Sequence, residues 1–160
     1  MVIEAPLSRY KKQNFMIIIG ILVGAAVIFG YDGYLSKYEW SMRYSFYKKH
    51  VVDNGGVPDG TMDFNQKYPP FFFLGGVIVA AYYIAVKGKK VLADEDALKT
   101  EKETITYDTI EKIDKTHFDN KGYFIITYKD SSGQNKDLKV SDRTYDNLGA
   151  VLDHVVEKIS

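Results

Sequence analysis

FMIIIGILVGAAVIFGY, residues 15–31, and PFFFLGGVIVAAYYIAV, residues 70–86, are two runs without Lys, Arg, Asp, Glu or His. A helix needs about 17 to 25 apolar residues to cross the roughly 30 Å hydrocarbon core of a bilayer. Both runs reach the lower end of that range, and aromatic or polar residues flank them. We therefore predict a membrane α-helical hairpin, with transmembrane helices over residues 15–31 and 69–86.

The composition limits what the rest of the chain can do. The 160 residues include 21 basic and 21 acidic side chains and no cysteine, which excludes disulfides, thiolate catalysis and cysteine-based metal sites. Residues 1–90 carry 11 Lys and Arg against 6 Asp and Glu, whereas residues 91–160 carry 10 against 15. An acidic C-terminal part argues against nucleic acid as a partner, because such binding needs a basic surface.

Positive charge lies just outside both runs. Lys and Arg near the ends of a span tend to stay in the cytoplasm, so we expect residues 1–14 to be an N-terminal cytoplasmic segment and residues 87–160 to be cytoplasmic too. The protein would then be an integral protein of a bacterial inner (cytoplasmic) membrane. A cleavable signal peptide has a similar pattern, but we expect the first run to be retained as an anchor. The basic residues are Arg9, Lys11, Lys12, Lys87, Lys89 and Lys90.

Small residues recur at four-residue spacing within the two runs. Gly20 and Gly24 form a GxxxG step, and Gly76 and Ala80 repeat the spacing in the second run. Small residues let helices in lipid approach closely, so these positions predict a contact between the two spans or with another membrane subunit. The alternative is that Gly and Ala are simply common in spans. Channels and pumps usually carry charge inside the membrane, so an anchor or a peripheral subunit fits better.

Residues 32–68 are predicted to form an aromatic-rich interfacial helix followed by a loop. The first part should continue the first span, with Glu39 and Arg43 at the i,i+4 spacing of an ion pair. Tyr and Trp favour the headgroup zone of a membrane and are also favoured at protein interfaces. This segment is therefore expected to lie on lipid or to dock a partner, through Tyr34, Tyr38, Trp40, Arg43, Tyr44 and Tyr47.

Residues 87–160 read as a small α+β domain. Short strands are expected over residues 96–100, 104–107, 122–128 and 136–140, the last two forming a hairpin around a polar turn. The final segment repeats apolar residues at steps of three and four, which predicts one amphipathic helix that covers the sheet. Its stripe consists of Tyr145, Leu148, Val151, Leu152, Val155, Val156 and Ile159.

The order of these elements resembles the PH-like domains of small bacterial membrane proteins, in which the domain follows one or two spans. The resemblance is carried by I-x-Y-D-x-I-x-x-I over residues 105–113, K-G-Y over residues 121–123, the hairpin and the C-terminal helix. It implies a bent antiparallel sheet, closed by a helix and used as an interaction module. It implies no catalytic residues.

No pattern for catalysis, cofactor binding or metal binding stands out. The sequence has no Walker loop, no dinucleotide-binding GxGxxG and no GxSxG elbow. Of its three histidines, His154 is expected to be solvated on the last helix. We therefore expect no catalytic, cofactor-binding or metal residues and no enzyme activity, although an enzyme without a local motif stays open.

Two functions fit these features. The first is a non-catalytic accessory or scaffold subunit of a larger membrane protein complex, with the lipid bilayer and other membrane subunits as partners. The second is a membrane-tethered sensor or regulator whose PH-like tail binds a lipid headgroup or a peptide.

Overall fold

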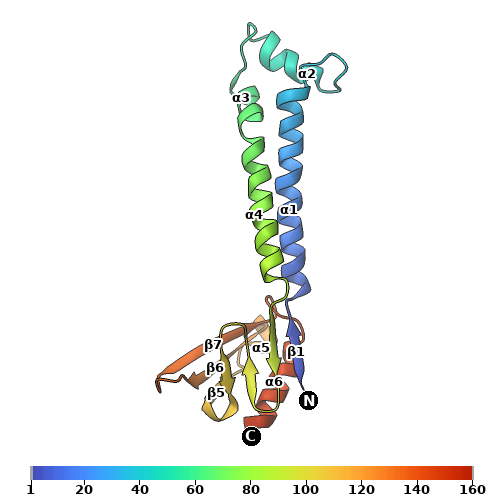
Figure 1. Cartoon of the computed structure of the whole chain (residues 1–160). Coiled ribbons are helices and arrows are strands. Elements are labelled where there is room, and N and C mark those ends of the chain that lie inside the picture. Colours follow the sequence, from blue (N-terminus) through green and yellow to red (C-terminus); the bar gives the residue numbers. More distant parts are fainter. Residues whose placement is uncertain (1, 160) are drawn as a thin grey trace. The chain divides into compact units, whose positions relative to one another are not determined.

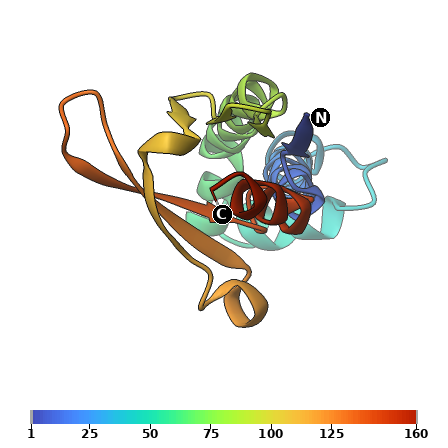
Figure 2. The ribbon, with the colours of Figure 1, turned by 90° about the horizontal axis from the view of Figure 1, so that it is seen from below.

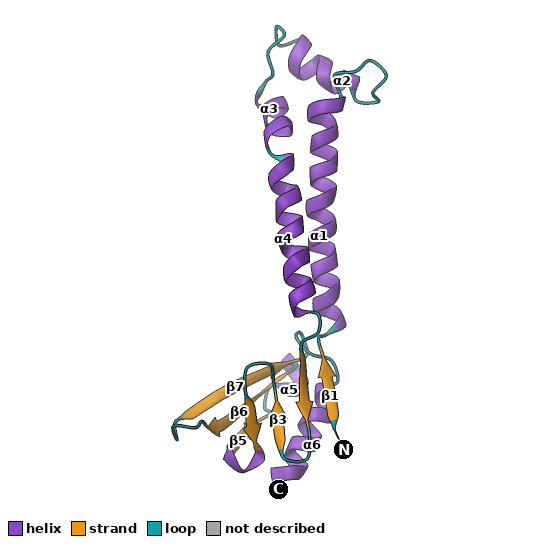
Figure 3. Ribbon diagram, in the orientation of Figure 1, coloured by secondary structure: helices purple, strands orange, loops and turns teal. Residues whose placement is uncertain are grey.

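A computed structural model describes residues 2–159. The chain divides into two compact units, one formed by residues 15–83 and the other by residues up to 14 together with residues from 84 onward. We call them the hairpin unit and the sheet unit. Helices dominate the first unit, and all the strands of the described chain lie in the second (Figure 3).

Most of two long helices lies in the hairpin unit, and the start of the first and the end of the second belong to the sheet unit. Helix α1 covers Arg9–Gly30 and is extended by a π-helical turn, η1, over Tyr31–Leu35. Helix α3 covers Gly60–Lys67, and α4 covers Pro69–Val86, the range predicted for the second span. Between them lie a short helix, α2, over Tyr44–Tyr47 and a second π-helical turn, η2, over Lys48–Val52. Helices α1 and α4 run side by side in both ribbon views (Figures 1 and 2).

Both long helices expose their apolar side chains. The stretches Arg9–Leu35 and Gly60–Val86 are long and apolar enough to cross a membrane, and only 6% and 17% of their most apolar windows are buried. A core helix of a soluble protein would bury most of that surface. The exposed side chains include Ile17, Ile21 and Ile28 on α1 and Phe71, Phe73, Ile78 and Ile84 on α4.

The sheet unit contains two antiparallel sheets and a C-terminal helix. The first sheet has the order β1-β2-β3-β4, formed by Ile3–Pro6, Lys90–Ala93, Ala97–Lys99 and Thr104–Thr106. The second has the order β5-β6-β7, formed by Ile110–Asp114, Tyr123–Lys129 and Asn135–Ser141. A 3-10 turn, η3, covers Tyr107–Thr109, α5 covers Phe118–Lys121, and α6 covers Leu148–Ile159.

Strand β1 was not expected from the sequence. The segment 1–14 was predicted as a separate N-terminal piece, but Ile3–Pro6 pairs with β2, with Ile3 opposite Ala93 and Pro6 opposite Lys90. The hairpin unit is therefore inserted, in sequence, between two paired strands of one sheet. A domain drawn over residues 87–160 alone leaves out one edge strand.

The core of the sheet unit lies between the sheets and α6. Phe124 and Ile126 on β6 are fully buried, and Val151 and Val155 on α6 pack in the same cluster. This confirms the predicted apolar stripe from Leu148 to Val156, whereas Tyr145 precedes the helix and Ile159 is 38% exposed. Ala5, from β1, is also part of the cluster.

A left-handed glycine ends helix α5. Gly122 has φ of +67°, and a Cβ there would lie 1.9 Å from the Asp142 carboxylate. Only glycine fits both the backbone angle and the space, which explains the K-G-Y start of strand β6.

Candidate functional site

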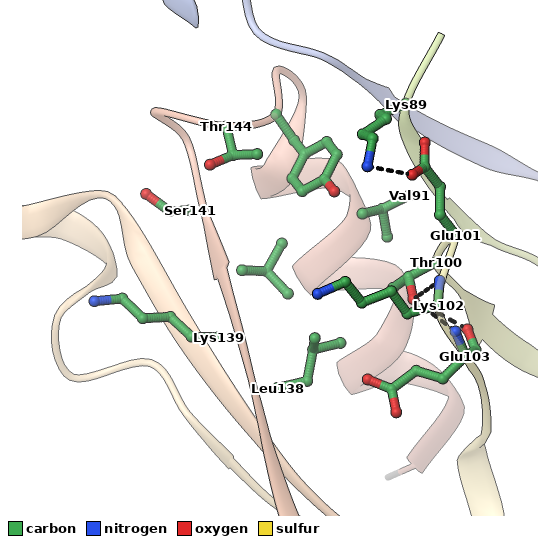
Figure 4. Close-up of a pocket in the computed structure, with 12 residues that line it drawn as sticks. Lys89, Val91, Thr100, Glu101, Lys102, Glu103, Leu138, Lys139, Ser141 and Thr144 are labelled. Carbon is green, nitrogen blue, oxygen red and sulfur yellow. Dashed lines mark hydrogen bonds and ion pairs between the residues drawn. The ribbon is translucent and has the colours of Figure 1, made fainter. Parts of the chain in front are cut away.

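One cleft of the sheet unit lies between β7 and the β3–β4 turn. It encloses about 230 Å³ and is drawn in Figure 4. Val91, Leu138 and Tyr145 give it an apolar lining, and burial raises the pKa of the Tyr145 phenol. The cleft therefore offers a half-apolar recess to a ligand, with the charged turn at its rim.

Charged side chains surround this recess. Lys89 Nζ lies 2.7 Å from a Glu101 carboxylate oxygen, and Figure 4 shows the Lys102 side chain reaching into the space between the turn and β7. Glu103 accepts a hydrogen bond from the Tyr128 hydroxyl, which raises the pKa of Tyr128 to about 12. The rim thus combines a lysine directed into the cleft with carboxylates that already have partners.

Part of the polar lining of the cleft is used by the turn between β3 and β4. The lining residues include no histidine, and the Thr100 hydroxyl is used by the turn itself, donating to the Glu103 carbonyl at 3.1 Å and accepting from the Lys102 and Glu103 amides. Across residues 2–159, no group of three His, Asp or Glu side chains comes together to hold a metal ion.

Asp94 connects the first sheet to α6. Its carbonyl accepts hydrogen bonds from His154 Nε2 and from the Tyr107 hydroxyl, both at 2.9 Å. Its carboxylate accepts from Lys99 and from the amides of Asp96 and Ala97, which lowers the pKa of Asp94 to about 2. The expectation of a solvated His154 is wrong, because this side chain is only 9% exposed.

The two long helices meet along one face each. Gly76 is the close-contact position, since a Cβ there would lie 3.2 Å from a Val23 methyl carbon. Aromatic rings pack at both ends of the contact, Phe15 with Tyr83 and Phe29 with Phe72, with centroids 5.6 Å apart in each pair.

The predicted small-residue positions fall into two groups. Gly76 is buried against α1 and Ala80 is half-buried, one turn away on α4. Gly20 and Gly24 lie elsewhere, because nothing comes within 4 Å of where their Cβ atoms would be. The structure therefore does not bring the GxxxG step of α1 onto Gly76 and Ala80.

The connection between the long helices is an ordered polar cluster. Arg43 donates from Nε and Nη2 to the two carboxylate oxygens of Asp32, at 2.8 and 2.7 Å. Asp32 is 5% exposed, so the bidentate pair satisfies a buried carboxylate and raises the pKa of Arg43. The predicted Glu39–Arg43 helix pair is wrong, because residues 36–43 form turns and Arg43 reaches back to Asp32.

Two further contacts fix this connection. A Cβ at Gly33 would lie 2.2 Å from the Asn65 carbonyl oxygen, so η1 and α3 touch backbone to backbone. Asp59 caps α3 by accepting from the Thr61 and Met62 amides, and His50 contacts its carboxylate at 2.7 Å, which lowers the pKa of Asp59.

The predicted aromatic contact residues do not share one helix face. Tyr38 and Trp40 lie in the turns, with Tyr38 43% and Trp40 70% exposed. Tyr44 and Tyr47 belong to α2 and are half-buried. Tyr34, on η1, donates its hydroxyl proton to the Gln66 carbonyl. Only part of this set therefore presents free aromatic surface.

Comparisons with protein-family models, curated proteins and solved structures find no match to the chain.

Sequence reasoning missed two features of these sites. The first is the cleft, whose two sides, near residues 100 and 140, are far apart in the sequence. The second is the Asp32–Arg43 pair, for which there was a signal: Asp32 is the first charge after an uncharged run, and a carboxylate at the end of a span needs a partner.

We expect Asp94 to make the sheet unit acid-sensitive. Its folded-state pKa of about 2 lies below the ordinary value of 3.8, so the stability that it contributes is complete above about pH 4 and is lost as pH falls through about 2. Asp94→Asn should lower the unfolding temperature near neutral pH and flatten its decline between pH 4 and 2.

Thermal unfolding of the full chain, followed by circular dichroism over that pH range, measures this effect. Asp153→Asn on the exposed side of α6 is the control. Its unfolding temperature should fall between pH 4 and 2 as steeply as that of the wild type. If the unfolding temperatures of Asp94→Asn and the wild type fall equally steeply over this pH range, the role given to Asp94 is contradicted.

Proposed function

We propose that the chain is a two-span protein of the bacterial inner membrane and acts as a non-catalytic accessory or scaffold subunit of a larger membrane complex. Its sheet unit would be a PH-like interaction domain on the cytoplasmic side. The observation that carries this proposal is the open space beside Gly20 and Gly24 on α1, since nothing lies within 4 Å of where their Cβ atoms would be.

The exposure of α1 and α4 supports a membrane location. Apolar side chains point outward along both helices, a pattern that suits lipid as the solvent. A cleavable signal peptide fits less well, because cleavage after α1 would remove Ala5 and Leu7, which are 0% and 1% exposed in the sheet unit.

The pairing of β1 with β2 supports one orientation for both ends. The two strands precede α1 and follow α4, so a hairpin that spans the membrane twice returns the chain to the side from which it started. Basic residues beside both strands favour the cytoplasm for that side.

The small-residue surface of α1 supports a partner within the membrane. Helices in lipid gain little hydrophobic energy by meeting, so close backbone approach at small residues drives their association. Because the hairpin uses Gly76 for its own contact and not Gly20 or Gly24, those two positions are left for a helix of another subunit.

Extraction in a gentle detergent tests this proposal. The wild-type chain should migrate well above its bare mass of 18.2 kDa, together with stoichiometric membrane subunits. The double change Gly20→Leu and Gly24→Leu should release it as the bare chain, because the larger side chains block a close helix contact.

Gly76→Leu is the matched control. A leucine there should clash with Val23 and loosen the contact between the two helices, which would be seen as faster proteolysis of residues 36–59. It does not alter the surface at Gly20 and Gly24. A wild-type chain that migrates alone, or a double variant that keeps its companions, would contradict the proposal.

The cleft favours a second candidate, a membrane-tethered sensor or regulator that binds a lipid headgroup. Lys102 reaches into a recess that is lined partly by apolar side chains, which suits an anionic group carrying a short apolar segment. A peptide ligand is the other form of this candidate.

Titration of soluble glycerol phosphate into the full chain in phosphatidylcholine nanodiscs tests the headgroup version. Calorimetry should detect saturable binding at low salt that Lys102→Glu abolishes and Lys112→Glu, on exposed β5, leaves intact. No binding at low salt would remove the headgroup version.

A further inference from the structure

The segment between η1 and α2, Ser36–Arg43, is a loop that we call the aromatic loop. Its large side chains are among the most exposed of the described chain, with Met42 at 90% and Trp40 at 70%. Tyr38 stacks on Trp40, with ring centroids 5.5 Å apart and planes at 11°. The loop therefore presents a small rigid apolar surface.

The two serines of the same loop point inward, whereas its charged side chains, Lys37 and Glu39, are exposed. Ser36 and Ser41 are 0% and 6% exposed, with Ser36 donating to the Asp32 carbonyl and Ser41 lying 3.1 Å from the Tyr31 hydroxyl. A loop in water usually has the opposite arrangement, with polar groups solvated and large apolar groups covered. The aromatic loop exposes large apolar side chains next to charged ones, which suits a boundary between water and a less polar surrounding.

The Asp32–Arg43 pair fixes this arrangement. Asp32 belongs to η1, which continues directly from α1, and Arg43 is the last residue of the loop. Two charge-assisted hydrogen bonds join them, and such forked pairs set geometry as well as energy. Arg43 therefore closes the loop onto the end of α1 instead of extending to a partner.

The loop lies beside the end of the first helix. Figure 1 shows it projecting sideways from that end, and Figure 2 shows the same projection along the helix axes. Apolar side chains are exposed on α1, as at Ile28, and again at Leu35, Tyr38 and Trp40 beyond its end. The aromatic surface thus follows in sequence the helix whose apolar side chains would face lipid.

The exposed charges in and beside the loop are mostly basic, since one carboxylate, Glu39, is accompanied by three lysines. Lys37 lies over the Tyr38 ring, with Nζ 5.1 Å from its centroid, and Lys48 and Lys49 follow on η2. Trp and Tyr favour the boundary between headgroups and acyl chains, where an apolar ring meets a wet edge. Basic residues beside them add attraction to anionic lipid.

We propose that the aromatic loop inserts into the headgroup–acyl boundary of the membrane, with Trp40 and Met42 as the immersed side chains and Arg43 as a positioning residue. This inference rests on the proposed membrane-spanning role of the hairpin unit. It assigns the loop to lipid, whereas a protein partner at the loop is an outcome that the test distinguishes.

Trp40 provides the test, because it is the one tryptophan of the chain. The full chain is reconstituted at high dilution into vesicles of phosphatidylcholine and phosphatidylglycerol, and its fluorescence is recorded with iodide or with brominated lipids. Emission should shift to the blue, and iodide quenching should fall several-fold relative to free tryptophan. Lipids brominated near the headgroup should quench more strongly than lipids brominated near the chain end.

Two variants test whether the Asp32–Arg43 pair sets the depth of Trp40. Asp32→Asn removes the negative charge and one of the two oxygens that accept from Arg43, and it should reduce quenching by the shallow brominated lipid while raising quenching by iodide. Asp63→Asn breaks the exposed Asp63–Lys67 pair of α3 and should leave both values unchanged. Should Asp32→Asn fail to fold, the quenching pattern of the wild type decides the proposal on its own.

A wash with alkaline carbonate separates failure of this inference from failure of membrane spanning. Release of the chain from the vesicles would overturn membrane spanning and this inference with it. Retention with iodide-accessible Trp40 would overturn only this inference. Retention with Trp40 shielded from both iodide and brominated lipid would overturn it in favour of a protein contact.

Discussion

The pairing of β1 with β2 is the interaction on which the rest of the structure depends. Four residues before α1 lie in register with four residues after α4, and Ala5, Val91 and Ala93 enter the same core. The pairing continues beyond β1, because the Leu7 amide donates to the Lys89 carbonyl at 2.9 Å. Both ends of the hairpin unit are therefore tied into one sheet.

Such a pairing would be costly across a flexible connection. Closing a loop of about 80 residues costs on the order of 4 kcal/mol in chain entropy. The hairpin unit removes most of that cost, because packing of Phe15 against Tyr82 and Tyr83 already brings the start of α1 to the end of α4. The packing of the long helices thus shortens the loop that separates β1 from β2.

Local patterns predicted the elements whose signals are local. The uncharged run after Pro69 and Pro70 predicted α4 with its observed bounds, and the alternation around the Gly133 turn predicted the β6–β7 hairpin. Strand β1 escaped prediction because it has four residues and a partner more than 80 residues away. Residues 36–43 escaped because a helix pattern competes there with the need of buried Asp32 for Arg43, and the ionic requirement prevails.

The two units use apolar side chains in opposite ways. The sheet unit hides Phe124, Ile126 and Val151 completely, as a domain in water does. The hairpin unit turns Ile21, Ile78 and Trp40 outward while it buries Asp32 and Ser36. The candidate sites follow this division, since the cleft belongs to the unit that buries its apolar side chains, whereas the α1 surface and the aromatic loop belong to the unit that exposes them.

The most direct measurement is disulfide formation between Glu4→Cys and Leu92→Cys in intact membranes, since the chain has no other cysteine. These residues are register partners, at the separation of about 5 Å that a disulfide spans. The paired strands predict rapid oxidation to the internally crosslinked chain, with no crosslink for Glu4→Cys and Lys99→Cys, two strands apart at roughly 10 Å. Equal or absent crosslinking in the two pairs would show that the N-terminal segment does not join the sheet and would contradict the inserted hairpin.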